Sequence, residues 1–124
     1  MTEYLISFND GAMDHIPGGE MPDVGKAVQA VVQEAVNAGV WVYGGGLERQ
    51  QASVVAMNGT VTDGPFPETR EVIGGFSVVD VATRDEALTW AAKLADACRC
   101  PQEVRELMSD SETDALLREA DSRG

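Results

Sequence analysis

Residues 61–76 have the sequence VTDGPFPETREVIGGF and lead from a short β-branched segment into the longest strand candidate of the chain. Asp63 ends a short β-branched segment directly before a Gly-Pro pair, where its side chain can bond the amides of its own turn. Gly64 can take backbone angles that other residues avoid, and the prolines at 65 and 67 stiffen the following loop. The Gly74-Gly75 pair inside a long strand candidate predicts a bulge or a close backbone approach. Such a loop beside such a strand indicates either a well-built turn or a wall of a shallow ligand pocket.

Strand candidates lie on both sides of this stretch. The Asn58-Gly59 pair predicts a tight hairpin turn. The segment from residue 40 continues into the three glycines at 44–46. The complete set of predicted strands covers residues 4–8, 40–43, 53–57, 60–62, 71–81 and 102–108.

Two amphipathic helices are predicted between the strand groups. The first begins near Pro22 and ends at Gly39, and the second follows a Thr83/Glu86 capping box and ends before Pro101. The apolar stripe of the first helix consists of Val24, Ala27, Val28, Val31, Val32, Ala35 and Val36. The order of elements predicts an α+β fold, an antiparallel sheet with two helices on one face.

The composition is that of one globular domain. The 124 residues include 9 Lys and Arg against 21 Asp and Glu, a net charge of −12. Such a charge repels phosphate backbones and anionic lipids, so we expect neither nucleic-acid nor membrane partners. Nothing predicts a cofactor. Cys98 and Cys100 are too close in sequence for an unstrained disulfide, which favours reduced thiols and a cytoplasmic protein, as does the absence of an apolar run or signal-like start.

We expect one domain at residues 1–108 and an acidic tail at 109–124, either frayed or a short helix lying on a partner. Helices on one face leave the other face of the sheet uncovered. Burying that face against a second copy is the simplest remedy, which predicts a homodimer formed through the sheet.

The motif at 61–76 resembles the core of the YCII-related, or DGPF-domain, family. The resemblance rests on DGPF at 63–66, ETRE at 68–71 and GGF at 74–76. It extends over about residues 3–108, including the first strand, the AGV at 38–40, the glycine-rich segment ending at Leu47 and the acidic helix start at 85–91. The resemblance implies a ferredoxin-like plait that dimerises through its sheets, as in the dimeric α+β barrel superfamily.

The family also implies candidate site residues. Some relatives are inferred to be small-molecule enzymes with a His–Asp pair in a cleft, and many accompany extracytoplasmic-function sigma factors. Asp63 carries the aspartate of the motif, whereas the first helix has no histidine. His15, in the loop before that helix, is the candidate partner for proton transfer, or is simply a solvated loop residue.

Other residues around the motif are candidate ligand contacts. Arg70 offers a planar fork of donors, and Glu68 and Phe66 are held by the proline-stiffened loop. Gly45 and Gly46 would line the cleft. Arg49 can fix a ligand or form a surface ion pair. A metal site from Asp10, Asp14 and His15 is allowed by ligand type but has no supporting spacing, so none is expected.

Three hypotheses follow for function. The first is a small-molecule enzyme doing acid–base chemistry (an elimination, isomerisation or hydrolysis) with Asp63 as proton acceptor. The second is a non-catalytic small-molecule-binding module or a sigma-factor accessory protein. In the third, the motif chiefly builds the dimer.

Overall fold

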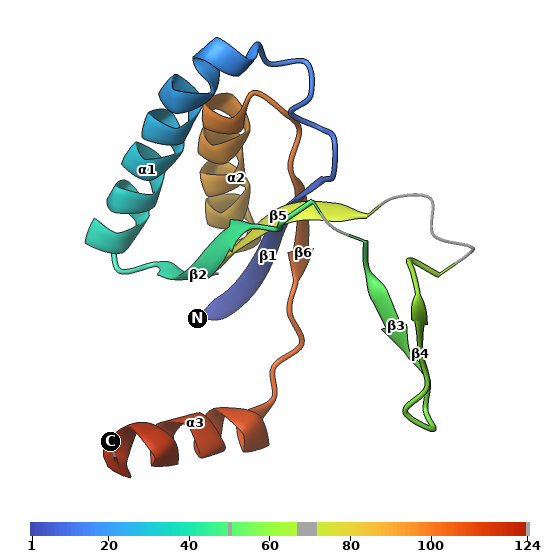
Figure 1. The fold of residues 1–124 in the computed structure, drawn as a ribbon. Coiled ribbons are helices and arrows are strands. Elements are labelled where there is room, and N and C mark those ends of the chain that lie inside the picture. Colours follow the sequence, from blue (N-terminus) through green and yellow to red (C-terminus); the bar gives the residue numbers. More distant parts are fainter. Residues whose placement is uncertain (50, 67–71, 124) are drawn as a thin grey trace.

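The structure is a computed structural model that describes residues 1–49, 51–66 and 72–123. Four strands form the main sheet in the order β2-β5-β1-β6, with every neighbouring pair antiparallel. These are β1 (Thr2–Asn9), β2 (Trp41–Gly46), β5 (Ile73–Val81) and β6 (Glu103–Glu106). Helices α1 (Met21–Asn37) and α2 (Arg84–Cys98) lie together on one face (Figure 1). The predicted ferredoxin-like plait is confirmed.

The core lies between this sheet and α2. Side chains alternate along a strand, so Tyr4 and Ile6 of β1 share a face with Val79 and Val81 of β5. They pack against a face of α2 that consists mainly of small side chains, which lets the helix approach the sheet closely. The helix residues in this cluster are Ala87, Ala91 and Leu94.

The predicted helix ends are confirmed. Gly39, after α1, has φ +74°, the left-handed conformation that glycine adopts without strain. Thr83 caps α2, because its Oγ1 accepts from the Glu86 amide at 3.2 Å. The Glu86 carboxylate accepts from the Ala82 amide at 3.4 Å, one residue earlier than a capping box predicts.

The apolar stripe of α1 packs less fully than its periodicity predicts. Val24 and Ala35 are buried, whereas Val28 and Val32 are half-buried and Val36 is 51% exposed. The helix contacts α2 and, less extensively, β2, and Val31 in its middle packs against the core. A cavity lies in the space beneath it.

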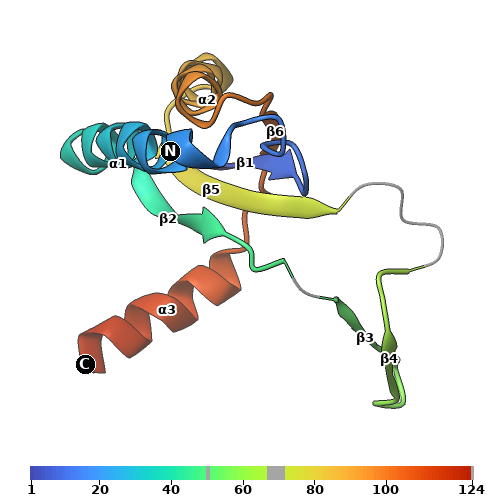
Figure 2. The same cartoon turned by 45° about the horizontal axis from the view of Figure 1, so that its top comes forward.

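The strands β3 (Ser53–Val55) and β4 (Val61–Asp63) form a separate two-stranded sheet. The predicted Asn58-Gly59 turn joins them: Gly59 has φ +89°, and Asn58 Oδ1 accepts from the Thr60 amide at 3.0 Å. In both views this hairpin projects away from the helices and the main sheet (Figures 1 and 2).

Residues after β6 form helix α3 (Ser111–Arg123), so this part of the tail is helical, and its docking on a partner stays a prediction. Asp110 starts it by accepting from the Thr113 amide at 3.1 Å and from the Thr113 hydroxyl at 2.8 Å. Helix α3 lies on the side of the sheet opposite α1 and α2 (Figure 2), with Leu116 and Leu117 exposed. No helix in the described ranges has both the length and the apolar character needed to cross a bilayer.

Candidate functional site

A cavity of about 470 Å³ lies between α1 and the main sheet, and we call it the α1 cavity. Strands β2 and β5 form one side, α1 forms another, and the loop after β1 contributes Met13. Its lining residues are Phe8, Met13, Met21, Val24, Gly25, Val28, Gln29, Val32, Trp41, Gly44, Gly45, Gly46, Phe76, Ser77, Leu94, Cys98 and Gln102.

The three glycines of β2 explain why the cavity exists. A strand of ordinary residues would fill the space beneath α1 with side chains, whereas residues 44–46 contribute only backbone. Gly44 is also required sterically, because a Cβ there would lie 2.6 Å from the Phe76 carbonyl oxygen. Gly45 and Gly46 have no such neighbour within 4 Å. Gly45 and Gly46 line the α1 cavity, whereas the DGPF loop does not, and the role of these two glycines as ligand contacts stays a prediction.

The chemistry of the α1 cavity is apolar and uncharged. Among the lining residues that the structure describes, Cys98 is the one ionisable residue, and burial, aided by the nearby Cys100, raises the pKa of its thiol to about 11. At neutral pH this thiol is protonated, which makes it a poor nucleophile and a poor base. Gln29, Ser77 and Gln102 supply the polar groups. The arrangement suits binding of a neutral molecule better than proton transfer.

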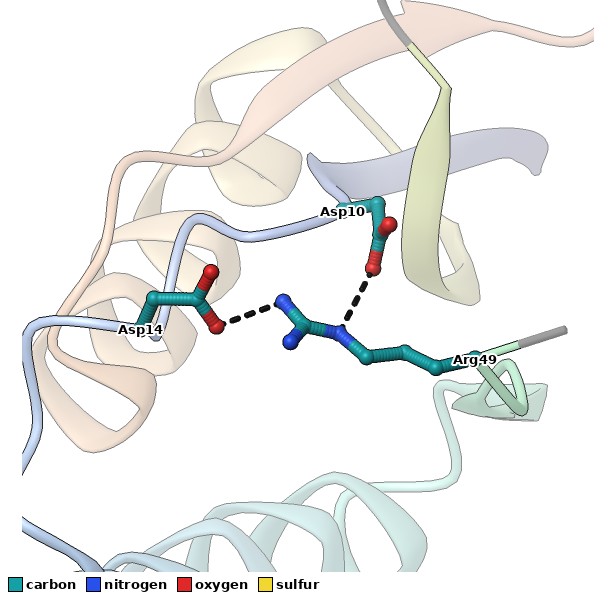
Figure 3. A network of polar contacts seen from close by, with 3 residues as sticks. All are labelled: Asp10, Asp14 and Arg49. Carbon is teal, nitrogen blue, oxygen red and sulfur yellow. Dashed lines mark hydrogen bonds and ion pairs between the residues drawn. The ribbon is translucent and has the colours of Figure 1, made fainter.

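A second hollow, of about 420 Å³, adjoins the α1 cavity and shares Phe8, Met13, Met21 and Gly46 with it. Arg49 lies at this hollow and bonds two carboxylates of the loop after β1 (Figure 3). These bonds, to Asp14 and then to Asp10, raise the pKa of Arg49, so its guanidinium stays charged. Of the alternatives open for Arg49, the structure shows the ion pair.

Asp63 lies away from the α1 cavity. It is the last residue of β4, it is exposed, and in the described part of the chain its carboxylate has no hydrogen-bond or ion-pair partner. It is not among the residues that line the α1 cavity or the neighbouring hollow. The expected bonds from Asp63 to its own turn amides are absent from the described contacts. The turn is held instead by the Gly64 amide, which donates to the Ala52 carbonyl at 2.7 Å.

The other candidates have mixed placements. Phe66 is 62% exposed and lines neither cavity, and Glu68 and Arg70 lie outside the described residues. His15 is exposed and lines neither cavity, so no described contact joins it to Asp63. Asp10 and Asp14, considered with His15 as metal ligands, pair with Arg49 instead.

Most of the residues that line the α1 cavity are not predicted from the sequence to belong to a site. Val24, Val28 and Val32 were assigned to a packed core, and Met13 and Met21 were not singled out. The signal that could have identified them is the i, i+4 spacing of these valines together with Gly25, opposite a strand of three glycines. A helix face and a strand that both lack bulk at one level cannot fill the space between them.

The sheet face opposite the helices carries half-buried apolar groups beside the exposed Tyr43. By strand alternation, Leu5, Phe76 and Val78 share this face, and Tyr43 contacts Phe76 with ring centroids 6.2 Å apart. Asp80 lies on the same face, and its Oδ1 is buried without a hydrogen-bond partner among the described residues.

Comparison with known proteins gives two matches. A family model described as the YCII-related domain matches residues 20–108. An uncharacterized protein of Rhizobium meliloti (strain 1021) is 51% identical over 37 residues, which make up 30% of this chain. The matched segment also spans only 30% of that protein's length.

Proposed function

Because the chain belongs to the YCII-related domain family, we propose that it is a small-molecule-binding member whose ligand occupies the α1 cavity. The observation that carries this proposal is a cavity of about 470 Å³ with an apolar lining and a few polar groups. Ligand pockets typically have volumes of roughly 300–1,000 Å³ and this kind of lining.

The ligand is a neutral, mainly apolar molecule with one or two hydrogen-bonding groups. No Asp, Glu, Lys, Arg or His of the described ranges lines the cavity, so a buried ion would have no counter-charge from them. The net charge of −12 also repels anions at long range. Gln29, Ser77 and Gln102 are the groups available to orient a hydroxyl or carbonyl. Trp41 offers a flat surface for an aromatic ring.

A matched pair of ligands tests this proposal by thermal shift. A neutral naphthol is expected to raise the melting temperature, because a ligand that binds only the folded state stabilises it by mass action. The corresponding naphthoate, of similar size but charged, is expected to leave the melting temperature unchanged. Stabilisation by the acid but not by the alcohol would contradict the proposed ligand class.

Acid–base catalysis at Asp63 is the second candidate. It rests on the place of Asp63 in the DGPF motif at residues 63–66, because an exposed carboxylate alone is an ordinary surface feature. Asp63 lies outside the α1 cavity of its own chain, so catalysis needs the hairpin to meet a substrate elsewhere. The Asp63→Asn variant separates the two functions: it should bind naphthol as the wild type does, and loss of a turnover reaction with intact binding would favour the enzyme.

We also propose that the chain forms a homodimer through the open sheet face. Two features support this: the apolar groups on that face and the absence of a described helix packed on it. A twofold pairing would cover the face in both copies.

A further inference from the structure

Arg49 joins two segments that are far apart in the sequence. Its Nε donates to Asp10 Oδ1 at 3.1 Å and its Nη2 donates to Asp14 Oδ1 at 2.5 Å, as Figure 3 shows. Building on the proposed function, we propose that Arg49 is a positioning residue: it holds the loop of residues 10–16 against the α1 cavity and so sets the rate at which a ligand enters and leaves.

The loop of residues 10–16 and the segment of residues 47–49 are each attached to the beginning of β5 by a backbone hydrogen bond. The Asp10 amide donates to the Val72 carbonyl at 2.6 Å, and the Leu47 amide donates to the Gly74 carbonyl at 2.8 Å. The described hydrogen bonds that join the two segments directly to each other are those of Arg49. The Arg49 side chain is therefore the connection that holds the outer part of the loop.

The loop is shaped to receive this side chain. Gly11 has φ +83°, and a Cβ there would lie 3.2 Å from Asp14 Oδ2 and 3.6 Å from Arg49 Nη2. Three successive turns follow, in which the amides of Ala12, Asp14 and Ile16 each bond the carbonyl three residues earlier. These turns place both carboxylates toward one guanidinium, a fork of donors that can bond two acceptors at once.

Met13 connects the Arg49 contact to the cavity. It precedes Asp14 directly, and it lines both the α1 cavity and the adjoining hollow. Ile16, three residues on, is buried and anchors the far end of the loop. Releasing Asp14 frees the Met13 segment while its two ends stay attached, which opens that side of the α1 cavity.

The ion pairs of Arg49 are exposed to solvent, so they favour the closed loop only modestly and allow it to open. The side chains of Arg49, Asp10 and Asp14 are 59%, 51% and 63% exposed. Exposed pairs of this kind shift an equilibrium modestly, so removing both is expected to raise the open population about three- to tenfold. High salt should have the same effect by screening.

Cys98 reports the opening of the loop without any ligand. It is buried and lines the α1 cavity, whereas Cys100 is not among the lining residues. In a Cys100→Ser background, we expect methyl methanethiosulfonate to label Cys98 about three- to tenfold faster in Arg49→Gln than in the parent. Arg49→Lys should fall between them, because an ammonium keeps the charge but not the fork. Adding Asp14→Asn to Arg49→Gln should change little further.

The matched control is Lys93→Gln. Lys93 Nζ lies 2.9 Å from Glu34 Oε1, an ion pair of similar exposure that joins α2 to α1 and leaves the loop untouched. Its labelling rate should equal that of the parent. An unchanged rate in Arg49→Gln, or equal acceleration in both variants, would overturn the proposal. If Arg49→Gln folds poorly, salt replaces it: labelling of the parent should accelerate between low and 1 M NaCl.

Stopped-flow binding of the neutral fluorophore N-phenyl-1-naphthylamine gives the second readout. Arg49→Gln should raise the association and dissociation rates together and leave the Kd nearly unchanged, whereas a distorted cavity would change the Kd itself. If the fluorophore does not bind the wild type, the proposed ligand class fails while the Cys98 labelling still decides the role of Arg49.

Discussion

Gly44 lies so close to β5 that a Cβ built on it would stand 2.6 Å from the Phe76 carbonyl oxygen and 2.8 Å from Ser77 Cα. The backbone cannot yield without disturbing the β2–β5 ladder. Gly44→Ala is therefore expected to lower the free energy of unfolding by about 1–3 kcal/mol, as overpacking does. Gly45→Ala is the matched control, because no atom lies within 4 Å of its Cβ position. Urea unfolding of both variants checks this, and equal losses would be inconsistent with the steric explanation.

From the raised pKa of the Cys98 thiol we predict how the free energy of unfolding depends on pH in the alkaline range. Burial raises its pKa to about 11 in the folded chain, from an ordinary value of 9.0. Above pH 9 the unfolded chain therefore releases a proton that the folded chain retains, so stability falls as pH rises toward 11. In a Cys100→Ser background, Cys98→Ala should show a shallower fall between pH 9 and 11. Urea unfolding at several pH values measures it, and parallel curves would contradict a buried thiol.

The open sheet face predicts the oligomeric state. Val78 lies in the middle strand β5, opposite Leu5 on one side and Tyr43 on the other. A glutamate at Val78 would place a charge in the proposed dimer interface, so Val78→Glu should sediment as a monomer where the wild type sediments as a dimer. Val36→Glu, on the exposed side of α1, should leave the dimer intact. A monomeric wild type at micromolar concentration would refute the interface.

Asp110 caps helix α3, and we predict that this cap stabilises the first turn of the helix. Its hydrogen bonds from Thr113 lower the pKa of its carboxyl, so the charged form that caps the helix persists to lower pH than an unbonded aspartate allows. The cap is lost as pH falls through this lowered pKa. Asp110→Ala should speed amide exchange in the first turn of α3, and Asp110→Asn should do so less. Ser109→Ala, one residue earlier, should leave exchange unchanged.

Local signals in the sequence predicted most of the fold. The Asn58-Gly59 turn, the Gly39 helix end and the Thr83 cap each depend on residues a few positions apart, and each is present. The observed strand limits differ from the predicted ones by at most three residues. The predicted strand at 71–81 is observed over Ile73–Val81, and Phe8 pairs with Gly75 just before a register shift, the irregularity expected from the Gly74-Gly75 pair.

The candidate site was harder to predict because it depends on distances across the fold. The Arg49 contacts join residues 39 and 35 positions apart, and no periodicity encodes them. Gly45 and Gly46 were assigned to a cleft beside the Asp63 loop, whereas they face α1. The spacing of α1 from the sheet decides this, and that spacing depends on the bulk of both surfaces at once.

The most direct test of the proposed function fills the α1 cavity. Gly25 of α1 lines it, and no atom lies within 4 Å of its Cβ position, so a leucine there can extend into the space without straining the helix. Ala30→Leu is the control on the exposed part of the same helix. Fluorescence titration with N-phenyl-1-naphthylamine should show one site per chain in the wild type and in Ala30→Leu, and affinity at least about tenfold weaker in Gly25→Leu, the cost of roughly 1.4 kcal/mol of lost contacts. Equal affinity in Gly25→Leu and the wild type would show that the ligand binds elsewhere.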